Sequence, residues 1–393
     1  MKTNLFLFLS TWFLIQMVSA QPSLTRFDSI ITGDQQMEIF LPLLKNKNVA
    51  VVANHTSMIN GTNLVDSLLH AGISVSRIFS PEHGFRGNRD AGAKIKNGMD
   101  PETGLPVISL YGKHRKPDSS DLKNVDIVVF DLQDVGVRFY TYISTLSLVM
   151  EACAEQNIPI VVLDRPNPNG FYVDGPLLQK GYESFVGLHP IPVVYGMTIG
   201  EYARMVNGEK WLKNGLQCKL TVIPLKKYNH NMLVKLPVKP SPNLPDWQAV
   251  YLYPSLCFFE GTVVSVGRGT SKPFQIYGHP QMKGSFSFVP VSTPGASLHP
   301  KFENKQCKGF DLSNYANNVD HKPAQIHLKW LITAYKQIGK KTTFFNHYFN
   351  TLAGTDMLQK QIEAGKSEKQ IRQSWQNDLK KFLLIRKKYL LYP

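Results

Sequence analysis

At 393 residues, the chain is too long for one ordinary hydrophobic core, so we expect two domains. Hydrophobic residues make up 43% of it and charged residues 19%, a balance that is typical of globular proteins and excludes a largely disordered chain. The formal net charge of +15 favours an acidic partner, which could be nucleic acid, a membrane surface or an anionic polysaccharide.

The first twenty residues are typical of a secretory signal peptide. Lys2 supplies a positive start, residues 5–18 are almost wholly apolar, and the small residues Ser19 and Ala20 precede a cleavage point before Gln21. No later run reaches the roughly 18 apolar residues of a membrane span. We therefore expect an exported protein, periplasmic or secreted, with no integral membrane segment after signal cleavage and no nucleic acid partner.

Short apolar runs alternate with helical patterns from residue 48 onward. Strands are predicted at residues 49–53, 73–79, 125–130, 158–163 and 219–225. Helices are predicted at residues 63–70, 141–156 and 199–207. Near-continuous apolar strands separated by helices indicate a parallel sheet that is covered on both faces, which is an α/β fold.

Polar side chains follow four of the predicted strands directly. They are Asn54 and His55, Glu82 and His83, Asp131 and Asp134, and Asp164 and Asn167. The carboxyl ends of parallel strands lie along one edge of a sheet, where such folds bind ligands. Asp and Asn also cap helices and shape turns, but four successive strand ends of this kind favour a functional edge.

One segment of this edge, residues 80–87, is predicted to be the catalytic corner. It places a carboxylate, an imidazole and a guanidinium, those of Glu82, His83 and Arg86, within five residues of a strand end. Gly84 and Gly87 make a turn there easy to form.

Four prolines, at 237, 240, 242 and 245, indicate a stiff connector near the domain boundary. We predict a signal peptide at residues 1–20, a catalytic domain at 21–232 and a C-terminal domain at 233–393. In the C-terminal domain, Glu260, Arg268 and Thr270 lie in Gly-rich segments where the backbone could approach a ligand, with a plain hairpin turn as the alternative. A capping box at Ser367 starts a final helical region.

The four cysteines are widely spaced and include no C-x-x-C pair, so a zinc or iron–sulfur site is not indicated. An exported protein could form disulfides, but Cys153 falls on the apolar stripe of a predicted helix, which favours buried free thiols. The chain also lacks the G-x-G-x-x-G and G-x-x-x-x-G-K-[ST] motifs of nucleotide sites and the G-x-S-x-G serine elbow. No cofactor is predicted.

Six segments together resemble the signature blocks of the NamZ-type exo-β-N-acetylmuramidases. They are residues 80–87, 131–142, 163–168, 240–245, 260–262 and 267–270, and the resemblance extends over nearly the whole mature chain. It implies a Rossmann-like catalytic domain, a smaller α+β C-terminal domain, and a cleft that removes N-acetylmuramic acid from non-reducing ends of peptidoglycan-derived glycans or muropeptides. The proposed catalytic glutamate of the family matches Glu82. Val263 and Tyr195 depart from the family pattern, which commonly has Asn and His there, and both fall in predicted binding loops.

The chemistry can also be argued from the residues. Breaking a glycosidic bond requires a proton on the departing oxygen, and Glu82 is the best-placed acid. A two-carboxylate mechanism would add Asp131, Asp134 or Asp164, whereas a 2-acetamido sugar could use its own carbonyl oxygen. We predict Glu82, His83 and Asp131 as catalytic residues.

The lactyl carboxylate of N-acetylmuramic acid suits recognition by a guanidinium. The candidates are Arg86, Arg138, Arg165 and Arg268, although Arg138 or Arg165 could instead pair with an aspartate of the polar edge. The other predicted substrate-binding residues are Asn54, His55, Gln133, Asp134, Tyr140, Asp164, Asn167, Glu260 and Thr270. One rival function is a non-catalytic muropeptide-binding protein. Another is a metal-dependent hydrolase using His55, His83 and Asp131, but no tight ligand spacing supports it, and no metal is predicted.

Overall fold

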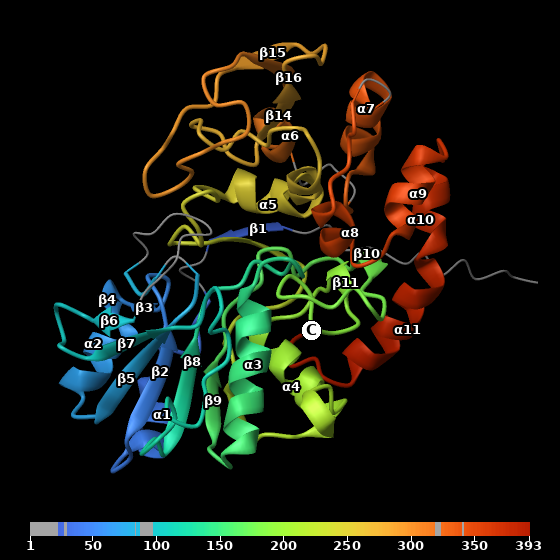
Figure 1. Cartoon of the computed structure of the whole chain (residues 1–393). Coiled ribbons are helices and arrows are strands. Elements are labelled where there is room, and N and C mark those ends of the chain that lie inside the picture. The colour runs from blue at the N-terminus through green and yellow to red at the C-terminus, as the bar shows by residue number, and fades with distance from the viewer. Residues whose placement is uncertain (1–22, 27–29, 83, 87–96, 319–323, 340–341) are drawn as a thin grey trace, which may run out of the picture.

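The computed structural model describes the chain outside residues 1–22, 27–29, 83, 87–96, 319–323 and 340–341, so the predicted signal peptide lies outside the described residues. The first domain is built around a seven-stranded sheet (Figure 1). In spatial order the strands are β12 (Leu220–Ile223), β9 (Ile160–Leu163), β8 (Ile127–Asp131), β2 (Val49–Ala53), β5 (Val75–Ser80), β7 (Pro106–Ser109) and β6 (Gly98–Met99). All neighbours pair in parallel except β6 and β7. This confirms the predicted parallel α/β sheet.

Helices cover both faces of this sheet, and successive strand residues face opposite layers. In β2, Ala50 and Val52 pack into one hydrophobic core, whereas Val49 and Val51 pack into another. All four are fully buried, and each such side chain stabilises the fold by about 1 to 3 kcal/mol. The first core includes α3 (Tyr142–Glu155) and α4 (Ile199–Gly208), and the second includes α1 (Met37–Leu44) and α2 (Leu64–His70).

Two strands of the sheet are absent from the sequence prediction. Both β6 and β7 are short, and β7 begins with Pro106, a residue that strands tolerate at their first position. They form the edge of the sheet next to β5. The predicted thiols are confirmed, since all four cysteines are buried and free.

The second, smaller domain is built around α5 (Trp247–Leu256) and a short 3-10 helix, Cys257–Gly261 (Figure 1). A three-stranded antiparallel sheet has the order β14 (Ile276–His279), β16 (Cys307–Asp311), β15 (Phe286–Phe288). Further helices are α6 (Ser313–Ala316), α7 (Leu328–Ile338), α8 (Tyr348–Ala353) and α9 (Met357–Glu363). Smaller pairings are β1 (Ser23–Arg26) with β13 (Met232–Lys235), β3 (Met58–Ile59) with β4 (Thr62–Asn63), and β10 (Asp174–Leu177) with β11 (Pro192–Val194).

The C-terminal region returns to the first domain. The predicted capping box starts α10 (Glu368–Ser374), and α11 (Gln376–Lys387) follows after a break at Trp375. The hydroxyl of Tyr392 then donates to Asp164 at 2.5 Å, and the Leu391 N–H donates to Glu201 at 2.7 Å. The end of the chain therefore stabilises the first domain, and the boundary at 232/233 stays a prediction. In the part of the chain described here, no helix combines the length and apolar character that crossing a membrane requires.

Candidate active site

The polar strand ends do not converge on one cavity, because several of them neutralise each other inside the fold. Arg165 donates from Nε and Nη2 to Asp131 Oδ1 and Oδ2 at 2.6 and 2.7 Å, and from Nη2 to Asp34 at 2.8 Å. Burial raises the pKa of Asp131, and the Arg165 guanidinium opposes that effect. Both side chains are almost completely buried. Asp131 is thus part of an internal ion-pair network. Arg165 pairs with an aspartate of the polar edge, which was the stated alternative to substrate binding.

Two further aspartates of the edge are buried acids. Tyr195 donates a short hydrogen bond to Asp134 Oδ2, while Oδ1 has no hydrogen-bond partner within the described parts of the chain. Burial raises the pKa of Asp134 to about 7, and it raises the pKa of Asp164, which Tyr392 contacts, to a similar value. Tyr195 is fully buried, so this departure from the family pattern lies in the core and not in a binding loop.

Two of the candidate arginines are also committed elsewhere. Arg138 is completely buried and donates to backbone carbonyl groups, including that of Ile191 at 2.7 Å and that of Ala353 at 2.6 Å. Burial lowers its pKa to about 9. Arg86 donates to Asp100 at 3.0 and 2.8 Å. Neither guanidinium lines the main cavity.

Five other predicted binding residues also have internal partners. Asn54 donates to Tyr142 Oη at 2.8 Å, and His55 Nε2 lies 3.0 Å from the Lys239 carbonyl oxygen. The other three donate to backbone carbonyl oxygens: Gln133 to Pro166 at 2.8 Å, Asn167 to Met197 at 2.8 Å and Thr270 to Gly267 at 2.6 Å. None of the five lines the main cavity. His83 lies outside the described residues.

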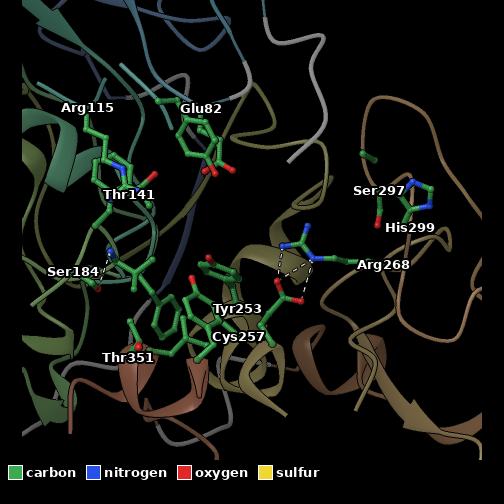
Figure 2. A pocket seen from close by; sticks show the side chains of 18 of the residues that line it. Glu82, Arg115, Thr141, Ser184, Tyr253, Cys257, Arg268, Ser297, His299 and Thr351 are labelled. Atoms are coloured by element: carbon green, nitrogen blue, oxygen red, sulfur yellow. Dashed lines mark hydrogen bonds and ion pairs between the residues drawn. The ribbon is translucent and has the colours of Figure 1, made fainter. Parts of the chain in front are cut away.

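The main cavity has a volume of about 710 Å³ and lies between the two domains. Figure 2 shows Glu82 and Arg115 on one side of it and Arg268, Ser297 and His299 on the other. From the first domain the wall comprises Glu82, Tyr111, Arg115, Phe139, Thr141, Ser184, Phe185 and Val186. From the second it comprises Tyr253, Cys257, Glu260, Arg268, Ala296, Ser297, Leu298, His299, Tyr348, Thr351 and Leu352. Three predicted site residues, Glu82, Glu260 and Arg268, thus meet here.

Glu82 follows the end of β5, forms a hydrogen bond with Tyr111 and acts through its charge on two further tyrosines. Burial, the charge of Glu82 and a hydrogen bond with it raise the pKa of Tyr111. Burial is the main cause that raises the pKa of Tyr142 and of Tyr348, and the charge of Glu82 contributes to both increases. The three phenols therefore stay neutral hydrogen-bond donors at neutral pH. A smaller cavity of about 60 Å³ shares Glu82 and includes Tyr142 and the predicted Tyr140.

On the facing wall, Glu260 and Arg268 form an ion pair, drawn with dashed lines in Figure 2. Arg268 Nη2 lies 2.8 Å from Glu260 Oε2, and Nε lies 3.2 Å from both oxygens. Burial opposes ionisation of Glu260, but the charge of Arg268, its hydrogen bond and the charge of Lys301 together outweigh burial and lower the pKa of Glu260. The Gly-rich segment serves this geometry, because Gly267 has φ +76° and a Cβ there would lie 2.8 Å from the Lys272 carbonyl oxygen.

A lysine joins two segments of this wall. Lys301 Nζ lies 3.0, 3.2, 2.7 and 3.3 Å from the backbone carbonyl oxygens of Phe259, Glu260, Thr262 and Val264, which share its three N–H donors. Glu260 lies within the segment that is held in this way, and residues 296–299, which precede Lys301, line the cavity. Lys301 therefore supports both the ion pair and the rim next to it.

Most aromatic and cationic residues that line the cavity are not among the site residues predicted from the sequence. Tyr111 follows β7, a strand too short to be predicted, so its place after a strand end is not recognisable from the sequence. Arg115, Ser184, His299 and Tyr348 come from loops and a helix start that no sequence pattern connects to Glu82. Val263 does not line the main cavity either, so neither departure from the family pattern reaches its wall.

The described residues include one cluster with metal-ligand geometry, His114, Asp118 and Asp121, whose ligand atoms lie within 4.8 Å of one another. None of the three lines the main cavity. Asp118 is already the hydrogen-bond acceptor for Ser120, and Asp121 accepts from His114 at 2.7 Å. The described part of the chain has no such cluster containing His55 and Asp131, the described members of the rival metal site.

The fold and the cavity define a two-domain α/β enzyme in which a carboxylic acid at a strand end faces a cleft rich in aromatic and charged groups. The chain belongs to the NamZ family of exo-β-N-acetylmuramidases. The N-terminal domain of that family matches residues 49–248, and its C-terminal domain matches residues 251–392.

One named relative agrees with this assignment, and two solved structures share the fold. The chain is 39% identical over 369 residues to the peptidoglycan β-N-acetylmuramidase NamZ of Bacillus subtilis (strain 168), a match that covers 89% of this chain and 88% of that protein. It resembles the crystal structure of a DUF1343 family protein from Bacteroides fragilis NCTC 9343 with a TM-score of 0.86 and 48% identity, over 92% of this chain and 99% of that one. A second DUF1343 protein from the same strain has a TM-score of 0.79 and 27% identity, over 93% and 99% of the two chains.

Proposed function

We propose that this protein hydrolyses the β-glycosidic bond of N-acetylmuramic acid at the non-reducing ends of peptidoglycan fragments. The observation that carries the proposal is Glu82, a carboxylic acid among neutral tyrosines at the wall of a 710 Å³ cavity. Cavities of about 300 to 1,000 Å³ are usual for small ligands. Membership of the NamZ family supports the same substrate class.

In this mechanism Glu82 donates its proton to the departing glycosidic oxygen as the bond from C1 breaks. The other carboxylate that lines the main cavity among the described residues is Glu260, and Arg268 neutralises it. Asp131, Asp134 and Asp164, the alternatives from sequence, do not line it. This geometry favours the sugar's own acetamido oxygen as the group that attacks C1, with water later opening the cyclic intermediate and returning a proton to Glu82.

Walls from both domains support attack at chain ends, because a pocket bounded by two domains admits one terminal sugar more readily than a long internal strand. Release of N-acetylmuramic acid one monosaccharide at a time is the expected product pattern, and capping the terminal sugar should stop it. The predicted signal peptide supports export to the periplasm or the medium. Sequencing the N-terminus of the mature protein would check whether it begins at Gln21.

The role of Glu82 can be tested by comparing leaving groups. A sugar hydroxyl must be protonated as it departs, whereas a nitrophenolate leaves without help. Glu82→Gln should therefore lose most activity on a natural disaccharide and keep a much larger share on the nitrophenyl N-acetylmuramide. The matched control is Glu38→Gln, at an exposed carboxylate of α1. Equal losses on both substrates, in a folded variant, would remove Glu82 from the acid role.

A further inference from the structure

The cavity is lined by two arginines whose surroundings differ. The Arg268 guanidinium is occupied by the carboxylate of Glu260 at 2.8 Å. Arg115 takes part in none of the ion pairs found among the described residues, and its guanidinium carbon lies 4.7 Å from the centre of the Phe185 ring. Such stacking holds the guanidinium plane while its N–H groups at the edge stay available. Arg115 is thus an exposed cation over an aromatic ring, and it has no ion-pair partner among the described residues.

The positive charge of Arg115 lies at the same end of the cavity as Glu82, the proposed acid. Burial and Glu82 raise the pKa of Tyr111, whereas the charges of Arg115 and Arg268 lower it, so both guanidinium groups act on the end of the cavity where Glu82 lies. Arg115 comes from the same loop after β7 as Tyr111, and Figure 2 shows it on the same side as Glu82. Glu260 on the facing wall is already paired with Arg268, whereas none of the ion pairs between described residues includes Arg115.

We propose that Arg115 is a specificity-determining residue that binds the lactyl carboxylate of N-acetylmuramic acid in a bidentate manner. The inference rests on the proposed function and assigns to Arg115 the role for which Arg86, Arg138, Arg165 and Arg268 are the candidates from sequence. The first three lie outside the main cavity, and the Nε and Nη2 edge of Arg268 is occupied by Glu260. A planar guanidinium and a carboxylate match in geometry, which distinguishes this substrate from an N-acetylglucosaminide.

A carboxylate could also come from the end of a stem peptide attached to the lactyl group. The two sources share their chemistry but differ in distance from the sugar ring. The carbon of the lactyl carboxylate is three bonds from a ring carbon, so this carboxylate lies close to the sugar whose glycosidic bond Glu82 would protonate. Substrates with a free lactyl group, with a neutral lactyl amide, and with a stem peptide on the lactyl group therefore separate them.

The test uses full-length Arg115→Met, Arg115→Lys and, as a matched control, Lys113→Met. Lys113 is an exposed cation of the same loop that does not line the cavity. The kcat/KM of Arg115→Met should fall about 10- to 100-fold on the nitrophenyl N-acetylmuramide, mainly through KM, which is the loss expected for a charged hydrogen-bonded pair. On the lactyl amide and the N-acetylglucosaminide, the kcat/KM of Arg115→Met should differ from the wild-type value by less than about 3-fold. Arg115→Lys should recover only part of the loss, and Lys113→Met should behave as wild type.

Equal losses on all the glycosides, or no loss on the N-acetylmuramide, would overturn the inference. A loss confined to the peptide-bearing substrate would assign Arg115 to the stem carboxylate and overturn the lactyl assignment. Calorimetric binding of free N-acetylmuramic acid and N-acetylglucosamine gives a readout that does not need turnover. If the wild type hydrolyses neither glycoside but binds N-acetylmuramic acid in a way that Arg115→Met abolishes, the proposed activity fails and the inference stands.

Discussion

Arg268 and Glu260 face each other across 2.8 Å on the wall opposite Glu82, with the guanidinium also lying 5.0 Å from the centre of the Phe274 ring. The pair therefore has two constraints on its position, one electrostatic and one from aromatic stacking. Because Glu260 is ionised and matched, its expected contribution is to hold Arg268 in place and not to exchange a proton with substrate.

We expect Glu260→Gln to lower kcat/KM on a natural disaccharide and on a nitrophenyl glycoside by the same factor, about 10- to 100-fold, because a positioned cation is needed whatever group leaves. Steady-state kinetics on both substrates measures this. Glu363→Gln, at an exposed carboxylate of α9, is the control. A loss restricted to the disaccharide would instead give Glu260 a role in proton transfer.

Lys301→Met should loosen the segment that carries Glu260, since it removes the donors for four carbonyl groups. We expect the free energy of unfolding to fall by about 2 to 4 kcal/mol and KM to rise more than kcat falls. Urea unfolding and kinetics measure the two effects, and Lys301→Arg should restore part of each. Lys308→Met, at an exposed residue of β16, is the control. Unchanged stability and KM would show that the four contacts do not support the cavity wall.

Asp131→Asn tests the predicted catalytic role of that residue against the ion pair with Arg165. Breaking a buried ion pair costs about 3 to 5 kcal/mol because a charge is left uncompensated. We expect a loss of stability of that size, with kcat of the folded fraction within about 3-fold of wild type, since Asp131 does not line the cavity. Denaturation monitored by circular dichroism and active-site-normalised kinetics measure the two quantities. A drop of kcat by orders of magnitude in a folded variant would restore Asp131 to the catalytic set.

The raised pKa values of Asp134 and Asp164 predict how the free energy of unfolding depends on pH. Burial raises the pKa of each to about 7, whereas unfolded aspartate titrates near about 3.9. Between these values the folded state binds more protons than the unfolded state, so stability should fall as pH rises from about 4 to 7 and change little above that range. Asp134→Asn should reduce the difference in unfolding free energy between about pH 5 and pH 8 by about 2 to 3 kcal/mol. Asp378→Asn, on the surface of α11, should leave it unchanged. An Asp134→Asn variant with the wild-type pH dependence would contradict the assignment.

The sequence by itself determined the parallel sheet and the position of its catalytic candidate. Residues 49–53 are apolar without interruption because helices cover both faces of β2, and that property can be recognised before any partner is known. Glu82 follows a strand for the same reason, since an apolar run that ends in a Gly-rich turn places the next polar group at the edge of the sheet. The Gly-rich segment of Arg268 was likewise identifiable, because positive φ values favour glycine.

Which polar residues neutralise each other was decided only by the tertiary structure. Asp131, Arg165 and Asp34 are far apart in the chain, and burial strongly favours pairing of an ionised group with a nearby opposite charge. Arg138 has no such charge beside it among the described residues and is held instead by backbone carbonyl groups, one of them 215 residues away. Conversely, Arg115 and Tyr348 become cavity residues only because the second domain packs against the first. Local sequence patterns encode burial and turns, but they do not encode which surfaces of two domains meet, and that meeting forms the cavity.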